Sequence, residues 1–268
     1  MKSKKNNTKA KKSKKTKGKH KKKFLRVLVY SVLVVFLLSL FFLIGYGIYY
    51  LCTSSNFNVG SVEYYGYSKY TLEEIEETAN ITLGKNIFKT SKKEITNNLN
   101  SLPYIKSVKI KRSLPDKLKI TVTEYDSKYF VYNIEDDSYY RVSDDFVILE
   151  KAKGEEKKED ELNLFGISFD DNVVIKDKLA LTEIEKILKF EKIFEVYEKS
   201  SIKNTITSVE FKDTNVILTL DYELNVIMND DDLNYRISFL KSIIDNLTSK
   251  SGTIDMTKEN PVFTGSIR

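Results

Sequence analysis

The sequence has 268 residues but only one cysteine, one histidine, three prolines and no tryptophan. Because Cys52 has no second cysteine to pair with, no disulfide within the chain can stabilise the fold, and packing must do so. Because His20 is the only histidine, a zinc site of His and Cys ligands and a catalytic triad that uses His are both excluded. These absences exclude a disulfide scaffold, a zinc protein of this kind and a hydrolase of the triad type.

Acidic residues are absent from the first 62 positions. The first 26 residues contain 13 lysines and Arg26 with few apolar side chains, so residues 1–26 are expected to form a disordered basic tail. The remaining chain has 30 basic and 38 acidic residues, a net charge of −8, although the whole chain carries +6. An acidic remainder gives no support to a nucleic-acid interface, so no nucleic acid is expected among the partners.

Charged residues are also absent from residues 27–52. As a helix rising about 1.5 Å per residue, this apolar run would reach about 39 Å, more than the ~30 Å of a bilayer's hydrocarbon core. A secretory signal peptide would be shorter and end in small residues, whereas this run ends in two tyrosines, Leu51 and Cys52, which predicts a retained transmembrane helix. Basic flanking residues stay in the cytoplasm, so we expect a single-pass protein of type II in the cell membrane, with residues 53–268 outside.

Both ends of this apolar run carry side chains typical of a membrane interface. A lysine cluster can bind any polyanion, nucleic acid included, but beside a span it fixes topology and contacts anionic lipid, which is the interpretation we favour. Tyrosines gather at the opposite end, where rings with a polar tip prefer to lie. The predicted interface residues are Lys21, Lys22, Lys23 and Arg26 at the inner end and Tyr46, Tyr49 and Tyr50 at the outer end.

Residues 56–124 have the pattern strand, helix, helix, strand, strand. The helix starts show the spacing of a capping box, and the last two strands alternate apolar and polar residues around a proline turn. We therefore expect a small α+β domain with a three-stranded sheet and two helices on one face. The signals are a run of strand-forming residues at 57–65, the capping pairs Thr71 with Glu74 and Ser91 with Glu94, and alternating apolar residues at 105–110 and 118–122.

Residues 125–268 predict a second α+β domain with a mostly antiparallel sheet. An early hairpin is followed by a polar stretch at 150–161 that we expect to be a solvated loop. Two amphipathic helices should pack on the sheet through one apolar stripe each. The first helix is expected at 182–198, with a capping box at Thr182 and Glu185 and a stripe of Ile184, Ile187, Leu188, Phe194 and Tyr197. The second helix is expected to be capped by Asp231 or Asp232 and to carry a stripe of Leu233, Ile237, Leu240, Ile244 and Leu247. Strands are expected at 205–211, 215–221 and 223–228.

Several short motifs occur in a characteristic order along the outer chain. They are Phe57 and Val59 in the opening strand, Gly66 at its end, Leu102-Pro103-Tyr104 followed by Arg112 and Pro115, and Glu124 after the last strand. In this order and at these spacings they resemble the POTRA module of the FtsQ/DivIB family of bacterial cell-division proteins. The resemblance continues more faintly through Leu164-Phe165-Gly166 to Gly252 and Ile254-Asp255-Met256, with Thr257 where the family commonly has an arginine.

The resemblance implies a function as well as a fold. It implies a POTRA domain at 56–124 and an FtsQ/DivIB-type β domain at 125–268. It also implies a non-catalytic scaffold at the division septum that binds FtsB/DivIC-like and FtsL-like single-span coiled-coil proteins. Through them it would help recruit or regulate the septal transpeptidase complex and peptidoglycan synthesis. The contacts implied for such partners are Ile254, Asp255, Met256, Thr257, Lys258, Val262 and Phe263.

Two other functions deserve comparison. An acyl-serine enzyme acting on peptidoglycan would use S-x-x-K and K-[ST]-G motifs, which occur at 200–203, 238–241 and 250–252, but Lys241 and Lys250 are nine residues apart, too close for an active site of this kind. A POTRA-bearing secretion component would lead into a barrel, for which this chain has no set of strands. The aspartates at 136–137, 144–145 and 230–232 lack the spacing of a calcium loop and indicate turns or a helix start. We therefore expect no catalytic residue, no metal and no cofactor.

Overall fold

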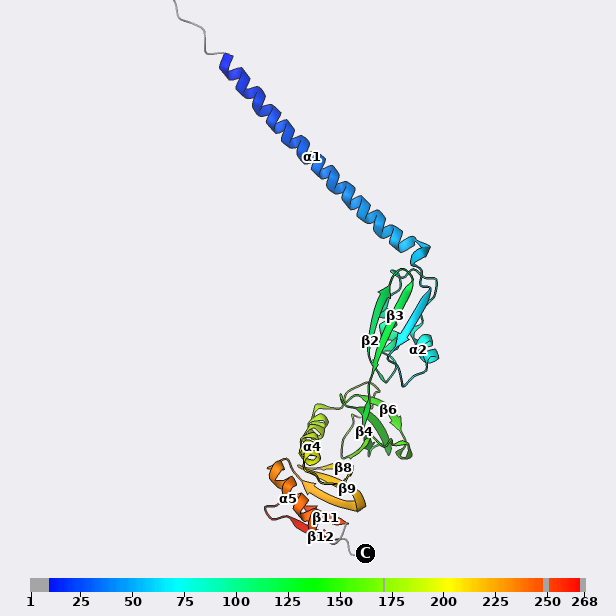
Figure 1. Ribbon diagram of the computed structural model, residues 1–268, viewed down its shortest axis with the longest axis vertical. Coiled ribbons are helices and arrows are strands. Elements are labelled where there is room, and N and C mark those ends of the chain that lie inside the picture. Colours follow the sequence, from blue (N-terminus) through cyan, green and yellow to red (C-terminus); the bar gives the residue numbers. More distant parts are fainter. Residues whose placement is uncertain (1–9, 171, 248–250, 266–268) are drawn as a thin grey trace, which may run out of the picture. The chain divides into compact units, whose positions relative to one another are not determined.

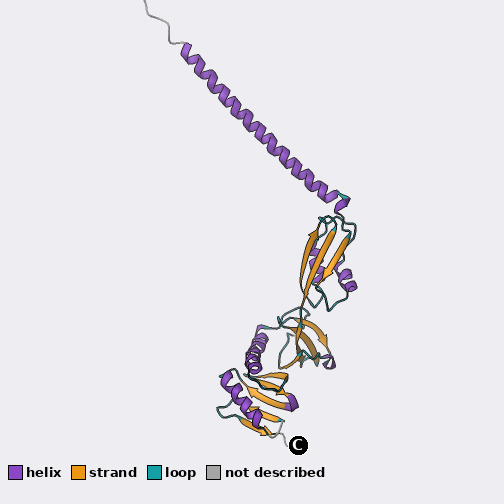
Figure 2. Ribbon diagram, in the orientation of Figure 1, coloured by secondary structure: helices purple, strands orange, loops and turns teal. Residues whose placement is uncertain are grey.

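The computed structural model describes residues 10–170, 172–247 and 251–265, with the backbone alone for residues 10–22 (Figures 1 and 2). Contacts divide the chain into two units, which are described separately. The first unit comprises Met1–Glu63, Asn80–Ile95 and Ile110–Ile120, and the second comprises Tyr64–Ala79, Thr96–Lys109 and Thr121–Arg268. The two units thus alternate along residues 56–124, and the boundary at Glu124 stays a prediction.

One long helix, α1 (Ala10–Thr53), contains the whole apolar run. Its segment Lys23–Thr53 is long and apolar enough to cross a membrane. The helix also extends back through residues 10–26, where the sequence predicts disorder. Lysine has a high helix propensity, and extending an existing helix is much less costly than nucleating one, so the apolar helix can propagate into the basic tail.

In the first unit, the segment after α1 folds against two later parts of the chain. The short helix η1 (Ser55–Phe57) follows directly. Backbone bonds then join Val59 N to Lys85 O at 2.9 Å and Gly60 N to Asp116 O at 2.8 Å. The core beneath them consists of Val59, Ile87 and Leu118, all buried. Residues that lie 26 and 56 positions apart in the sequence are thus held together immediately after the apolar helix.

The predicted order strand, helix, helix, strand, strand is confirmed. The elements are β1 (Ser61–Tyr65), α2 (Leu72–Ala79), α3 (Lys92–Leu99), β2 (Ile105–Ser113) and β3 (Lys117–Glu124). The strands form a sheet in the order β1-β3-β2. Gly66, which ends β1, has φ +82°, and a Cβ there would lie 2.2 Å from the carbonyl oxygen of Val122, so a glycine is required.

The capping box predicted at the start of α2 is present. The Glu74 carboxylate accepts bonds from the Thr71 amide at 2.8 Å and the Thr71 hydroxyl at 2.9 Å, and that hydroxyl accepts from the Glu74 amide at 3.3 Å. At α3, the Glu94 amide donates to the Ser91 hydroxyl at 3.2 Å. Side chains therefore satisfy amides that have no partner within the helix.

Replacing Thr71 with alanine should loosen α2 locally. Loss of an N-cap costs about 1 kcal/mol, which corresponds to roughly fivefold faster amide hydrogen exchange within the helix. Exchange of the α2 amides, followed by mass spectrometry, measures this directly. Glu77→Ala, an exposed change in the same helix, serves as the control and should leave exchange nearly unchanged; equal effects of the two changes would contradict the capping role.

The second unit is built on a nine-stranded sheet. Its order is β12-β11-β10-β9-β8-β7-β4-β5-β6, and its pairs are antiparallel except for β4 with β7, β7 with β8 and β10 with β11. The mostly antiparallel sheet predicted from the sequence is therefore confirmed. The strands are β4 (Ser127–Asn133), β5 (Ser138–Ser143), β6 (Ile148–Ala152), β7 (Leu162–Phe165), β8 (Ile206–Lys212), β9 (Asn215–Leu220), β10 (Leu224–Met228), β11 (Gly252–Asp255) and β12 (Val262–Gly265). Short 3₁₀ helices are η2 (Gly154–Glu156) and η3 (Asp221–Glu223).

Two helices connect parallel neighbours in this sheet. Helix α4 (Leu181–Lys199) links β7 to β8, and α5 (Leu233–Asn246) links β10 to β11. The helices contact each other, so both crossovers cover the same face of the sheet (Figure 1). Because a strand and its parallel neighbour must be joined by a crossover, these two helices fix the positions of the last five strands.

The apolar stripe predicted for α5 is confirmed, but the predicted cap is wrong, because the N-cap Asp232 makes no side-chain cap bond. The prediction for α4 is partly wrong as well. In α5 the predicted apolar residues are buried or pack on the core. In α4 the buried stripe is Ile187, Phe190, Ile193 and Tyr197, whereas Leu188 and Phe194 are exposed. The predicted capping box is also wrong, because α4 begins at Leu181 and its N-cap, Ala180, makes no side-chain cap bond. α4 has apolar residues around much of its surface, so only packing decides which of them are buried.

The polar stretch at 150–161 contains more structure than predicted. Its first residues extend β6, and its last residue, Glu161, has a fully buried side chain. The Glu161 carboxylate accepts bonds from Arg141 Nε at 2.9 Å, Ser127 Oγ at 2.5 Å and the Lys158 amide at 3.0 Å. Arg141 also pairs with Glu150. Composition predicts a solvated loop, but Ser127 and Arg141 come from β4 and β5, which no local pattern reveals.

Candidate functional site at the edge of the large sheet

The nine-stranded sheet has two edges, and among the described residues the backbone of another segment bonds to only one of them. At β6, the Ile148 amide donates to Asp177 O at 2.9 Å and its carbonyl accepts from the Lys176 amide at 2.8 Å. The strand also carries two charged side chains, Glu150 and Lys151. Charges and a covering segment are the usual means of blocking a sheet edge.

The segment that covers β6 is itself held firmly. The Lys176 ammonium donates to the carbonyls of Asn100, Leu102 and Ile105 at 2.6 to 3.0 Å. Burial lowers the pKa of Lys176. This edge of the sheet is therefore covered where β6 begins, and charged side chains occupy the middle of the strand.

The opposite edge, β12, differs in each respect. Of the described strands it pairs with β11 alone, antiparallel, with Gly252 opposite Gly265 and Asp255 opposite Val262. None of its four residues is charged, and Val262 is 46% exposed while Phe263 packs against the core. Among the described residues, no backbone hydrogen bond reaches the outer side of this strand. An uncharged edge with free backbone groups is suited to pairing with an added strand.

The loop between β11 and β12 is ordered by Asp255. Its carboxylate accepts bonds from the Thr257 hydroxyl at 2.6 Å and the Thr257 amide at 3.0 Å. The hydrogen bond from the Thr257 hydroxyl lowers the pKa of Asp255. The Thr257 amide and the charge of Lys258 also lower this pKa, while partial burial raises it. The carboxylate stays ionised at neutral pH and fixes the turn that returns the chain as β12.

The residues predicted to contact a partner have different environments. Ile254 and Met256 are fully buried in the core and hold β11 in place from within. Asp255 acts within the loop, and Thr257 and Lys258 lie at its surface. Of the seven residues, Val262 is the exposed apolar one in the edge strand. The direct contacts in this set stay a prediction, and the two buried side chains are not available at the surface.

Two features near this edge were not predicted from the sequence. On α5, Tyr235 and Phe239 stack with centroids 6.1 Å apart and are 67% and 38% exposed. Their helix reaches the loop before β12, where Arg236 donates to Lys258 O at 3.4 Å. Apolar residues out of phase with the buried stripe of α5 are the sequence signal that could have found this pair.

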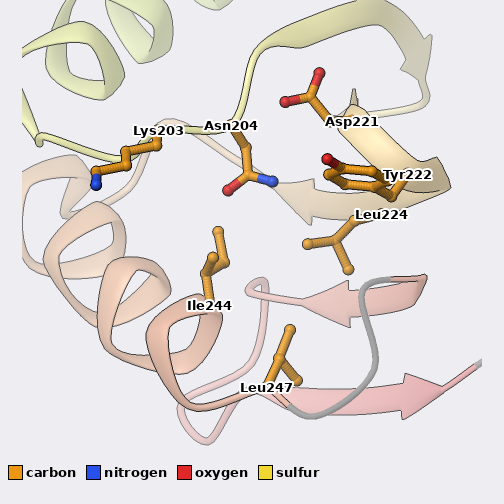
Figure 3. Close-up of a pocket in the computed structure, with 7 residues that line it drawn as sticks. All are labelled: Lys203, Asn204, Asp221, Tyr222, Leu224, Ile244 and Leu247. Atoms are coloured by element: carbon orange, nitrogen blue, oxygen red, sulfur yellow. The ribbon is translucent and has the colours of Figure 1, made fainter.

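The second feature is a hollow of about 340 Å³ at one end of the same sheet region (Figure 3). Leu224 in its wall pairs with Gly252, which pairs with Gly265, so the hollow lies in line with the end of β12. Apolar and polar side chains share the lining, which suits one side chain of a bound peptide. The lining residues are Lys203, Asn204, Asp221, Tyr222, Leu224, Ile244 and Leu247.

The predicted membrane-interface residues all lie on α1. Tyr46, Tyr49 and Tyr50 are exposed near its C-terminal end. Lys23 and Arg26 are exposed at the start of the apolar segment, while the side chains of Lys21 and Lys22 lie outside the described residues. The interface itself stays a prediction.

The serines considered for acyl-enzyme chemistry are bonded to helix backbone. The Ser200 hydroxyl donates to Tyr197 O at 2.6 Å and the Ser238 hydroxyl to Asn234 O at 2.7 Å. Lys241 pairs with Asp245 at 2.7 Å, and Lys250 lies outside the described residues. Among the residues with described side chains, no group of three His, Cys, Asp or Glu is placed to hold a metal.

Comparison with known proteins agrees with this architecture. Residues 57–125 match the family model "POTRA domain, FtsQ-type". The chain is 32% identical to the cell division protein DivIB of Clostridium botulinum (strain Hall), over 91% of this chain and 93% of the relative. DivIB of Clostridium acetobutylicum is 26% identical, over 77% and 82%, and cell division protein FtsQ of Syntrophotalea carbinolica is 26% identical, over 78% and 73%.

The fold and these matches define a POTRA-bearing protein with an N-terminal apolar helix that is a candidate membrane anchor. A relative matched over nearly its whole length carries the assignment beyond the POTRA module to the second domain. The chain belongs to the FtsQ/DivIB family of cell-division proteins.

Proposed function

We propose that this protein is a non-catalytic scaffold of the division machinery that binds FtsB/DivIC-like and FtsL-like single-span coiled-coil proteins. Through them it would help recruit or regulate the septal transpeptidase complex. The observation that carries the proposal is the contrast between the two sheet edges: β6 is charged and covered at its start, while β12 is uncharged and open among the described residues. The partner would add an extended segment to β12, with main-chain bonds giving affinity.

The surroundings of β12 support a partner with both a strand and a helix. The stacked pair Tyr235 and Phe239 offers aromatic contact area to a helix, since aromatic residues are common anchors at interfaces. The hollow beside Leu224 could receive one side chain of the added segment. A coiled-coil protein with a short extended tail would fit both surfaces.

We also propose that α1 anchors the chain in the cell membrane with the lysine-rich end in the cytoplasm, and that the protein acts at the septum. The charge asymmetry across the apolar run supports this orientation. An anchored scaffold meets single-span partners in the same membrane, which raises their effective concentration without any added contact.

The full-length protein, isolated from membranes of its own source in mild detergent, tests the proposal. We expect small coiled-coil proteins with one span to be enriched in the eluate, as identified by mass spectrometry. Their absence from the eluate would contradict the scaffold function.

A second measurement separates the scaffold from an enzyme. A fluorescent β-lactam should not label the protein, because the Ser200 and Ser238 hydroxyls donate to backbone carbonyls within helices. Covalent labelling that Ser200→Ala or Ser238→Ala abolishes would favour an acyl-serine enzyme instead.

A further inference from the structure

We propose that two loops of the first unit, 82–88 and 113–116, dock on the outer leaflet of the membrane that α1 spans. Leu83 and Leu114 would enter the headgroup region, and nearby lysines would bind anionic phospholipid. The proposal rests on α1 being a membrane anchor, as proposed above, and assigns a lipid-binding surface outside the helix itself.

The two leucines are exposed although the core of this unit is close by. Leu83 is 61% exposed and Leu114 56% exposed, whereas Ile87 and Leu118, which follow them along the chain, are fully or almost fully buried. Turn positions usually carry small or polar residues. Two large apolar side chains at two loop tips of the same unit are the arrangement expected of a surface that enters an interface.

Loop 82–88 is tied to the end of α1. The Asn86 side chain, 8% exposed, donates to Leu51 O at 3.0 Å and to Ser54 O at 3.4 Å. The backbone adds a bond from Ile87 N to Phe57 O at 2.7 Å. Leu83 is three residues from Asn86, and three residues span at most about 11 Å. Leu83 is therefore held within that distance of Asn86, which is itself bonded to the end of the apolar helix.

Loop 113–116 is tied to loop 82–88. Arg112 Nε donates to Ile87 O at 2.8 Å and its Nη2 to Thr90 O at 3.0 Å. The Asp116 carbonyl accepts from Gly60 N at 2.8 Å. Leu114 lies between these two anchored residues, so it cannot move far from the segment that follows α1.

Charge separates this unit from the rest of the outer chain. Residues 54–63, 80–95 and 110–120 contain eight basic and three acidic residues, a net charge of +5, and the remaining outer residues contain 22 basic and 35 acidic, a net charge of −13. Lys85, Lys89 and Lys111 are exposed beside the two loops. A basic patch attracts anionic lipid only within about a Debye length, roughly 8 to 10 Å, so its position next to the helix end matters.

These observations favour a lipid surface over a protein partner. The leucines stand on separate tips rather than forming a groove, and the bonds to Leu51 and Ser54 keep the loops near the depth at which a headgroup layer begins. Lipid is the occupant present wherever α1 is inserted.

Single-cysteine variants of the full chain test this, because Cys52 is the only natural cysteine. Cys52→Ser is combined with Leu83→Cys, Leu114→Cys or, as the matched control, Ile134→Cys, an 80% exposed turn residue of the second unit. Each protein is labelled with a polarity-sensitive fluorophore and reconstituted into phosphatidylcholine vesicles with or without phosphatidylglycerol. Lipids carrying a quencher near the headgroup report contact.

We expect a blue shift and quenching at positions 83 and 114 with no change at 134. Quenching should weaken without phosphatidylglycerol, at high salt, and in a Lys85→Glu, Lys111→Glu background, but not with Lys199→Glu. Unquenched labels at 83 and 114, while a label on natural Cys52 is quenched, would overturn the proposal and leave the anchor intact. An unquenched label on Cys52 would overturn the anchor and this proposal together. Quenching that is equal in neutral lipid would overturn the role of the lysines.

Discussion

Replacing Arg141 with methionine should lower the free energy of unfolding by about 3–5 kcal/mol, the usual cost of removing one partner of a buried ion pair. Arg141 has 9% of its side chain exposed and Glu161 none. Without the guanidinium, the Glu161 carboxylate would keep bonds from Ser127 and the Lys158 amide but lose its cation. Most of the cost comes from a charge left buried without a counterion.

The double change Arg141→Met with Glu161→Met separates this charge effect from packing. Removing both charges should cost less than removing either alone, because no unpaired charge remains. Lys199→Met removes an ion pair with Glu195 whose side chains are 71% and 69% exposed, so this control should shift stability by less than about 0.5 kcal/mol. Urea unfolding in detergent, followed by circular dichroism, measures the unchanged full chain and the Arg141→Met, Glu161→Met, double and Lys199→Met variants. A loss below about 1 kcal/mol for Arg141→Met would contradict a desolvated pair.

Ending the chain after Asn260 should abolish most binding of the coiled-coil partner. The truncation removes β12, and a four-residue edge strand can give an added strand about two to four backbone hydrogen bonds. At about 1 kcal/mol each, their loss weakens binding by roughly 30- to 1,000-fold. Co-purification of the partner, quantified by mass spectrometry, measures the loss.

Two further variants keep this test independent of folding. Ending the chain after Gly265 retains β12 and should retain the partner. The pair Val262→Lys and Thr264→Lys places charge on the exposed face of β12 without touching Phe263, which packs on the core, and should weaken binding while the unfolding transition is unchanged. Full partner recovery after removal of β12 would show that the partner binds elsewhere.

The proposed site shows where sequence reasoning was limited. The family resemblance points to residues 252–264, and this segment does form the last two strands at one edge of the sheet. It does not separate Ile254 and Met256, which are buried, from Val262, which is exposed. A strand alternates between two faces, but the sequence does not say which face a helix such as α5 will cover.

The sequence alone determined the features that depend on local pattern or on composition. These are the apolar segment, the charge difference on its two sides, the order of elements in the POTRA domain, and the capping box of α2. Each follows from neighbours within a few positions, because helix and strand periods and caps are set locally.

The tertiary structure alone decided which edge of the large sheet is covered, which apolar residues of α4 are buried, and that Glu161 pairs with Arg141. It also decided that the loop of Leu83 is bonded to the end of α1, because Asn86, three residues after Leu83, donates to Leu51 O. Each of these joins residues far apart in the chain. Strand register and side-chain burial arise from such non-local contacts, which local propensity does not encode.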